Sequence, residues 1–524
     1  MMSKVEMKHL VLALLLLLGI VSRFLNIGAQ GIKIDETWVV PTPNFHFQEK
    51  SIYPKLFDYQ QYKALSPARQ NLLKTIYEAH PIIQITIIRA VSDVHPPLFF
   101  VLNYYWSRWF GFDLWAIRSP AAIYWIFAAL VLPFFLLSQG IDIKVVILSL
   151  FLVVISPFYL FLSNYARPYT LLLLLDLLSC YLAYNLYAKG FTRRQALLYI
   201  VICIASLYTH YYALFVLIAQ ASYFAYESLR RKSFRDDVRK LCIIYAIIGL
   251  AFAPWVAVSL LQMKWRYPGI ENVGGFRYFN FEAIKELLLF FGPAYSRSTV
   301  HSALNYVASM IQFLLVVLGV RNMWQTRDSS VSRFWLFMLI APLAIGGIVN
   351  NIKPVYLPRN FSIVMIPYFV VCAIGISSLR GRIIRAASLI GIGAVGLYFA
   401  LYGLTYGNVR GELALEDWRG VANFIQTRYP TEQLTVYVYH SSFRDALYYH
   451  LPSEDMVKGL EDQIIKSGPK EEKFLLVIMN HELEPNEVKV MRKVPFLLKE
   501  DTYAATLVAK FGGAHIYYVM IKRD

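Results

Sequence analysis

The chain has 524 residues, of which 57% are hydrophobic and only 16% are charged. A soluble globular protein carries about 25% charged residues, so this composition excludes an ordinary soluble domain and favours a membrane protein. The net charge of +17 arises before residue 405, since the tail beyond it carries 15 Lys and Arg against 17 Asp and Glu. A basic excess between apolar runs is typical of cytoplasmic loops, and it argues against nucleic-acid binding.

Apolar runs long enough to cross a bilayer, about 17 to 25 residues, recur along the first 404 residues. We expect a polytopic α-helical membrane protein with about eleven transmembrane helices. The predicted spans are residues 8–25, 116–137, 143–162, 168–188, 196–209, 211–227, 241–262, 302–320, 334–350, 360–379 and 384–404.

The run HPPLFFVLNYYWSRWFG, residues 95–111, is short for a span and contains Arg108. If it lies flat at the membrane surface, four basic loops fall on the cytoplasmic side together with the N-terminus, as the positive-inside rule requires. These loops are KGFTRRQ, SLRRKSFRDDVRK, RNMWQTRDSSVSR and LRGRIIR. We therefore predict an interfacial or re-entrant helix here, whose Tyr and Trp side chains suit the headgroup region. This topology is that of a multi-pass protein of a plasma or inner membrane.

The sequence changes character after residue 405. The stretch LALEDWRGVANFIQTRYP has apolar residues at helical spacing. Three later stretches, LTVYVYHS, FLLVIMN and HIYYVMI, are rich in the β-branched and aromatic residues of strands. We expect a transmembrane domain over residues 1–404, with a long first outer loop at 26–115, and a small extracytoplasmic α/β domain over residues 405–524.

Ionisable residues at membrane depth are costly and are usually functional, and several fall at the outer ends of the predicted spans. An acidic pair, Asp35 and Glu36, lies in the first outer loop. The other groups are SNYARPY with Arg167 and Tyr169, YTHYY with His210, KPVYLPRN with Lys353, Tyr356 and Arg359, and the residues His95 and Arg118 that border the interfacial helix.

A carboxylate that faces cations and tyrosines at a bilayer surface suits a lipid-linked phosphate and a nucleophile. Arg grips phosphate through two parallel hydrogen bonds, and donors aimed at a leaving phosphate stabilise its growing charge. The carboxylate could take the proton of an attacking hydroxyl. Each group also has a simpler interpretation: a solvated acidic pair, an Arg167 that reaches lipid headgroups, and a His210 that bonds neighbouring helices. His95, which precedes two prolines, is expected to fix the start of the interfacial helix.

These landmarks, taken in order, resemble the GT-C membrane glycosyltransferases, in particular the branch of the protein O-mannosyltransferases and lipid A aminoarabinose transferases. The landmarks are the acidic pair, HPPL, IRSPAA, SPFYLFLSNYARPYTL, THYYALF and YLPRNFSIVMIPY. The resemblance runs from residue 1 to about 405. The resemblance implies that a sugar moves, with inversion, from a polyprenyl-phosphate carrier to an acceptor outside the cytoplasm. It also implies that the first acidic residue of the outer loop, Asp35, serves as the base.

The expected protein is thus a hexosyl- or pentosyltransferase of the cell envelope, with a glycan, lipid or protein as acceptor. Asp35 and Glu36 are its expected catalytic residues, with Glu36 positioning Asp35 or binding a cation. The expected ligands of the donor phosphate are Arg167, Tyr169, Arg359 and His210, supported by His95, Arg118, Tyr356 and Lys353. No metal site is predicted, and a divalent cation is compatible with these residues but not indicated by them.

Two other functions remain open from the sequence. A carrier or flippase for polyprenyl-linked lipids would use the same basic pocket without breaking a bond, although we see no inverted repeat of the kind common in transporters. A non-catalytic scaffolding subunit would need neither Asp35 nor Arg167. The stretch GIGAVG, residues 391–396, matches a dinucleotide-binding pattern, but it lies within an apolar span and predicts a close helix contact instead.

Overall fold

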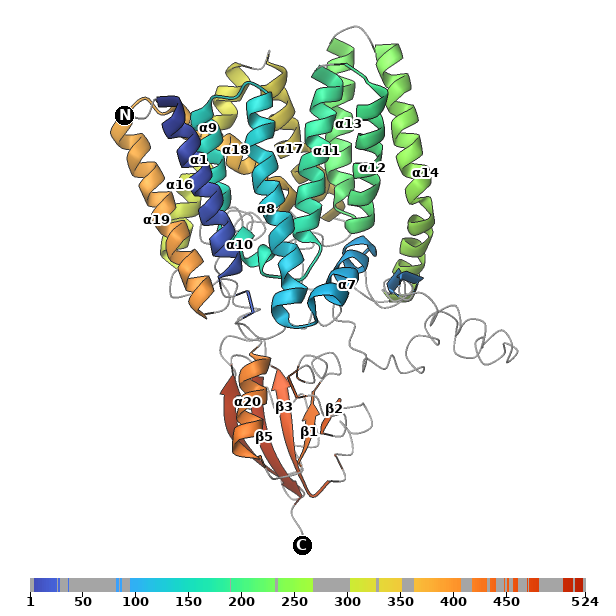
Figure 1. Ribbon diagram of the computed structural model, residues 1–524, viewed down its shortest axis with the longest axis vertical. Coiled ribbons are helices and arrows are strands. Elements are labelled where there is room, and N and C mark those ends of the chain that lie inside the picture. The colour runs from blue at the N-terminus through green and yellow to red at the C-terminus, as the bar shows by residue number, and fades with distance from the viewer. Residues whose placement is uncertain are drawn as a thin grey trace, which may run out of the picture.

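The protein is described here from a computed structural model. The described residues are 4–25, 27–28, 36, 82–83, 85–86, 95–188, 190–230, 234–266, 302–326, 329–350, 362–406, 417–430, 434–439, 447, 450–451, 456–459, 469, 471–479, 503–511 and 514–521. A bundle of long helices forms one end of the molecule and a small α/β unit the other, with the N-terminus at the far end of the bundle from that unit (Figure 1).

Each predicted span coincides with one helix of the structure, except the span at 143–162, which consists of two, and the predicted fold class is confirmed. The helices are α1 (Lys4–Phe24), α7 (Leu98–Phe110), α8 (Leu114–Ser138), α9 (Ile143–Ile155), α10 (Pro157–Ser163), α11 (Tyr169–Ala188), α12 (Arg193–Thr209), α13 (Ala213–Arg230), α14 (Phe234–Arg266), α16 (Ser302–Gln325), α17 (Ser330–Asn350), α18 (Ser362–Ser378) and α19 (Arg382–Tyr406).

The number of spans is supported only in part. Within the described residues, seven helices are long and apolar enough to cross a membrane, and the bent pair α9 and α10 makes an eighth. This pair covers the span predicted at 143–162 and turns by 61° at Ser156, where Pro157 cannot continue the hydrogen bonding of α9. The other three predicted spans, α12, α13 and α18, stand in the same bundle (Figure 1) but are shorter or more polar.

The helix predicted at residues 95–111 is α7, which lies at the end of the bundle next to the α/β unit (Figure 1). One face of α7 contacts α8, where the Asn103 side chain donates a hydrogen bond of 2.9 Å to the Ile117 carbonyl. The other face is open, and the Trp109 side chain is 79% exposed. A short helix with a bound polar face and exposed aromatic residues at a bundle end suits the interfacial position that the sequence predicts.

Two glycines bring α16 and α18 into backbone contact. A Cβ added at Gly375 would overlap the carbonyl oxygen of Leu315, and one added at Gly319 would overlap that of Val371. Small residues allow helices in a membrane to approach this closely, and the contact gains from packing rather than from the hydrophobic effect.

The GIGAVG stretch lies inside α19 and makes the helix contact that the sequence predicts. A Cβ at Gly393 would come within 2.9 Å of the Phe151 ring, and one at Gly396 within 3.1 Å of Ile155, both of which belong to α9. A dinucleotide-binding loop would need a preceding strand, whereas this stretch is helical throughout.

Polar side chains also link the helices inside the bundle. The Ser206 hydroxyl of α12 donates to the Asp176 carboxylate of α11 over 2.5 Å, and the Gln220 amide of α13 donates to the Ser179 hydroxyl over 2.8 Å. Glu227 of α13 pairs with Arg333 of α17. Such bonds satisfy groups that the surrounding apolar side chains cannot.

The α/β unit, called here the C-terminal unit, consists of α20 and five strands. These are α20 (Trp418–Arg428), β1 (Thr435–Val438), β2 (Val457–Gly459), β3 (Lys473–Met479), β4 (Tyr503–Phe511) and β5 (Ala514–Ile521). The sheet order is β2-β1-β3-β5-β4, in which β1 pairs parallel with β2 and β3, and β5 pairs antiparallel with β3 and β4. The helix and the three predicted strands are confirmed; β2 and β4 are additional.

The C-terminal unit and the bundle share one hydrophobic cluster. Trp418 and Ile425 of α20 belong to it, as do Phe100 of α7, Ile117 of α8 and Leu171 of α11. Apolar contacts therefore connect the C-terminal unit to the ends of three helices, next to the residues that the sequence selects for function.

The contact between α16 and α18 yields a stability prediction. We expect Gly375→Ala to lower the thermal unfolding midpoint of the purified protein by several degrees, because forcing a methyl group into a packed contact costs about 1–3 kcal/mol. Gly391→Ala is the control, since no atom lies within 4 Å of a Cβ at Gly391. An unchanged midpoint for Gly375→Ala would show that the two backbones are not in contact.

Candidate active site

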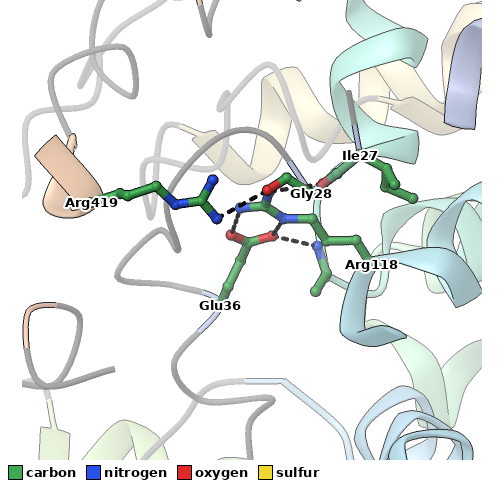
Figure 2. A network of polar contacts seen from close by, with 6 residues as sticks. Ile27, Gly28, Glu36, Arg118 and Arg419 are labelled. Atoms are coloured by element: carbon green, nitrogen blue, oxygen red, sulfur yellow. Dashed lines mark hydrogen bonds and ion pairs between the residues drawn. The ribbon is translucent and has the colours of Figure 1, made fainter. Parts of the chain in front are cut away.

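Glu36 is fully buried and, within the described part of the chain, accepts hydrogen bonds from three donor groups. Arg118 binds both of its oxygens, from Nε to Oε1 over 2.9 Å and from Nη2 to Oε2 over 2.6 Å. The Ala166 amide donates to Oε1 over 2.9 Å. Figure 2 shows this fork-shaped pair. A carboxylate used in this way holds other groups in place, and this geometry favours the positioning role for Glu36 over that of a proton acceptor.

Arg118 joins Glu36 to the end of α1. It lies in the second turn of α8, which Asp113 caps by accepting the Ala116 amide. Its Nη1 donates to the Ile27 carbonyl over 3.0 Å. One guanidinium therefore holds both the start and the end of the segment from residue 27 to residue 36 (Figure 2).

Arg167 is 4% exposed and lies in the turn between α10 and α11. Its Nη2 is 3.2 Å from Nδ1 and 3.4 Å from Nε2 of His95. A guanidinium can only donate hydrogen bonds, so in this contact a ring nitrogen of His95 is the acceptor. His95 thus contacts the expected phosphate ligand directly, beyond its expected role at the start of α7.

His210 lies directly after α12, in the same cluster. Its ring centre is 5.0 Å from that of His95 and 5.7 Å from that of Tyr169. The Tyr212 amide donates to its Nδ1 over 3.2 Å, so in the neutral ring Nε2 carries the proton and is the donor atom. The turns HPPL, SNYARPY and THYY, which are far apart in the sequence, therefore supply side chains to one buried cluster.

Arg167, His95, His210 and Tyr169 are called here the Arg167 cluster. This cluster lies next to the ion pair of Glu36 and Arg118, because Ala166, which donates to Glu36, immediately precedes Arg167. Four expected site residues lie outside the described residues: Asp35, Lys353, Tyr356 and Arg359. Asp35 is the chain neighbour of Glu36. Among the residues that the structure describes, no three His, Cys, Asp or Glu side chains gather to hold a metal ion.

Two residues of the C-terminal unit near Arg118 were not expected from the sequence. Arg419 donates to the Gly28 carbonyl over 3.0 Å (Figure 2). Burial, together with the positive charges of Arg419 and Arg118, lowers the pKa of His450 to about 4. No sequence motif marks either residue. Arg419 binds a backbone carbonyl, which any residue offers, and the lowered pKa of His450 comes from its surroundings in the fold.

His450 predicts a pH dependence of stability. Its pKa falls from an ordinary 6.5 to about 4 on folding, so below pH 6.5 the unfolded chain gains a proton that the folded chain does not. Unfolding therefore becomes easier as the pH falls from about 6.5 to 4. We expect the thermal midpoint to drop less between pH 7 and pH 5 in His450→Gln than in the wild type. Equal drops would remove His450 as the cause.

Solved structures with the same overall architecture identify the fold. No protein-family model and no curated protein sequence matches the chain. ArnT from Cupriavidus metallidurans in the apo state aligns over 97% of each chain with a TM-score of 0.54 and 10% identity. The same protein bound to undecaprenyl phosphate aligns over 98% of each chain, with a TM-score of 0.53 and 10% identity.

The archaeal oligosaccharyltransferase AglB from Archaeoglobus fulgidus also aligns. Its complex with an inhibitory peptide and a dolichol-phosphate matches 97% of this chain and 74% of AglB, with a TM-score of 0.51 and 12% identity. ArnT and AglB are both GT-C glycosyltransferases, and the resemblance found in the sequence is thereby confirmed at the level of fold. The chain is an integral, multi-pass membrane protein with the GT-C fold over nearly its whole length.

Proposed function

We propose that the protein is an inverting glycosyltransferase that moves a sugar from a polyprenyl-phosphate-linked donor to an acceptor hydroxyl. One observation carries this proposal: the hydrogen bond from the Ala166 amide to the Glu36 carboxylate. It joins Glu36, which follows Asp35 in the chain, to Ala166, which precedes Arg167. Inversion needs a base and a leaving group on opposite faces of one sugar, and this contact brings the segments of the proposed base and the proposed phosphate ligand together.

The donor phosphate is assigned to the Arg167 cluster. Arg167 supplies a fixed positive charge, while His210 and Tyr169 supply N–H and O–H donors beside it. Donors fixed in a buried site stabilise a developing phosphate charge without reorganising during the reaction. Arg359, with Lys353 and Tyr356 near it in the sequence, is proposed to complete this side. The undecaprenyl phosphate of ArnT and the dolichol-phosphate of AglB support a polyprenyl phosphate as the carrier.

The proposed reaction is a single displacement. Asp35 takes the proton of the acceptor hydroxyl as the oxygen attacks the anomeric carbon, from the face opposite the phosphate. The bond between the anomeric carbon and the phosphate oxygen breaks, and its electron pair leaves with polyprenyl phosphate. That phosphate is a weak base, so no general acid is required. Glu36, held by Arg118, positions Asp35 in this scheme.

The membrane topology completes the proposal. We assign the N-terminus to the cytoplasm, and the first outer loop and residues 405–524 to the opposite side. The acceptor then arrives from water and the donor from the bilayer. The sugar is a hexose or a pentose, and the acceptor is a glycan, a lipid or a protein.

The first test replaces the proposed base. We expect Asp35→Asn to fold normally and to lose about 10²–10⁴-fold in transfer rate, which is the usual contribution of a general base. The assay offers purified protein a panel of polyprenyl-phosphate sugars and follows sugar transfer and the anomeric configuration of the product. Asp142→Asn is the matched control: Asp142 caps α9, and Asn caps a helix as well as Asp does.

Full transfer activity in Asp35→Asn would end the assignment of the base. The same assay, repeated in liposomes, separates the enzyme from a carrier. A carrier moves the intact lipid-linked sugar across the bilayer and releases no polyprenyl phosphate, whereas the enzyme releases one polyprenyl phosphate for each sugar transferred.

A further inference from the structure

The C-terminal unit reaches the candidate site through Arg419, the second residue of α20. Its Nη2 donates a hydrogen bond of 3.0 Å to the carbonyl of Gly28, which lies 391 residues earlier in the chain (Figure 2). α20 is held independently of this bond, since Asp417 caps its N-terminus and Trp418 and Ile425 are buried. Arg419 is therefore presented to Gly28 by an anchored helix.

Ile27 and Gly28 offer consecutive carbonyls to guanidinium groups from two different parts of the chain. Arg118 donates to the Ile27 carbonyl and Arg419 to the Gly28 carbonyl, each over 3.0 Å. Both carbonyls lie past Phe24, the last residue of α1. Hydrogen bonds from an ionised donor are stronger than neutral ones, so two elements fix this short stretch of backbone.

Arg118 extends this constraint to the site. The guanidinium that holds the Ile27 carbonyl also binds both oxygens of Glu36. Glu36 in turn accepts the Ala166 amide beside Arg167. If the backbone at Gly28 shifted, Arg118 would either move with the Ile27 carbonyl or lose its hydrogen bond to it. Either change disturbs the two hydrogen bonds that Arg118 donates to Glu36.

We propose that Arg419 is a positioning residue of the transfer site, and that α20 serves the reaction by fixing the site's geometry. Arg419 acts through Gly28 and Arg118 on Glu36 and contacts neither donor nor acceptor. This inference rests on the proposed function and assigns to the C-terminal unit a role within the site, in addition to any binding of the acceptor.

The test compares three variants in the transfer assay. Arg419→Met keeps the length of the side chain but removes its donors, and Arg419→Lys restores one charged donor. Arg428→Met is the control, since Arg428 is exposed in the last turn of the same helix.

We expect Arg419→Met to lower kcat at least tenfold, because a displacement of about 1 Å at a reacting centre can cost about 100-fold in rate. The KM for the donor should stay within about twofold, since the Arg167 cluster itself is unaltered. Arg419→Lys should recover most of kcat, and Arg428→Met should match the wild type.

Hydrogen–deuterium exchange supplies a readout that does not depend on activity. We expect the Ala166 amide, which donates to Glu36, to exchange faster in Arg419→Met than in the wild type or in Arg428→Met. If Arg419→Met does not fold, Arg419→Gln, which keeps a neutral N–H donor, takes its place in both measurements with the same expected directions.

The inference is overturned if kcat in the Arg419 variant stays within threefold of the wild type, or if exchange at Ala166 does not change. It is also overturned if kcat falls and the donor KM rises by the same factor. Failure of the proposed function is recognised separately, because the wild-type protein would then transfer sugar from none of the donors, whatever the behaviour of the Arg419 variants.

Discussion

The arrangement of the site depends on one buried ion pair, between Glu36 and Arg118. Removing a single partner from such a pair costs about 3–5 kcal/mol, because the remaining charge is left buried without compensation. Besides compensating each other's charge, the two residues join the backbone past the end of α1, the start of α8 and the turn before α11. Elements from three parts of the chain therefore meet at one end of the bundle and keep a fixed relative position.

This geometry suits a reaction whose two substrates have opposite solubilities. In the proposed reaction, a lipid-linked donor reaches the site from the bilayer, and a polar acceptor reaches it from water. His95, His210 and Arg167 meet in one buried cluster, in which the positive charge of Arg167 favours an anionic group. The C-terminal unit lies next to this end of the bundle (Figure 1), and Arg419 makes it part of the same network.

Much of this could be predicted because it follows from local patterns. Hydrophobic run lengths predicted the long helices of the bundle. Ionisable residues near helix ends selected the turns of His95, Arg167 and His210, which the structure brings together. The partner of Glu36 could not be predicted, since it lies 82 residues away and nothing in either segment specifies the pairing. The bend at Ser156 was missed although its cause, Pro157, stands in the sequence. The strand β2 was missed because its three residues are too few to show a strand pattern. Arg419 gave no signal, since an arginine on an amphipathic helix is ordinarily solvated.

The most direct measurement is a structure of the protein with a polyprenyl-phosphate sugar bound. The account predicts that the phosphate lies within hydrogen-bonding distance of Arg167 and His210, and that the Asp35 carboxylate faces the anomeric carbon from the opposite side of the sugar. A phosphate bound away from Arg167, or an Asp35 carboxylate on the same face of the sugar as the phosphate, would contradict it.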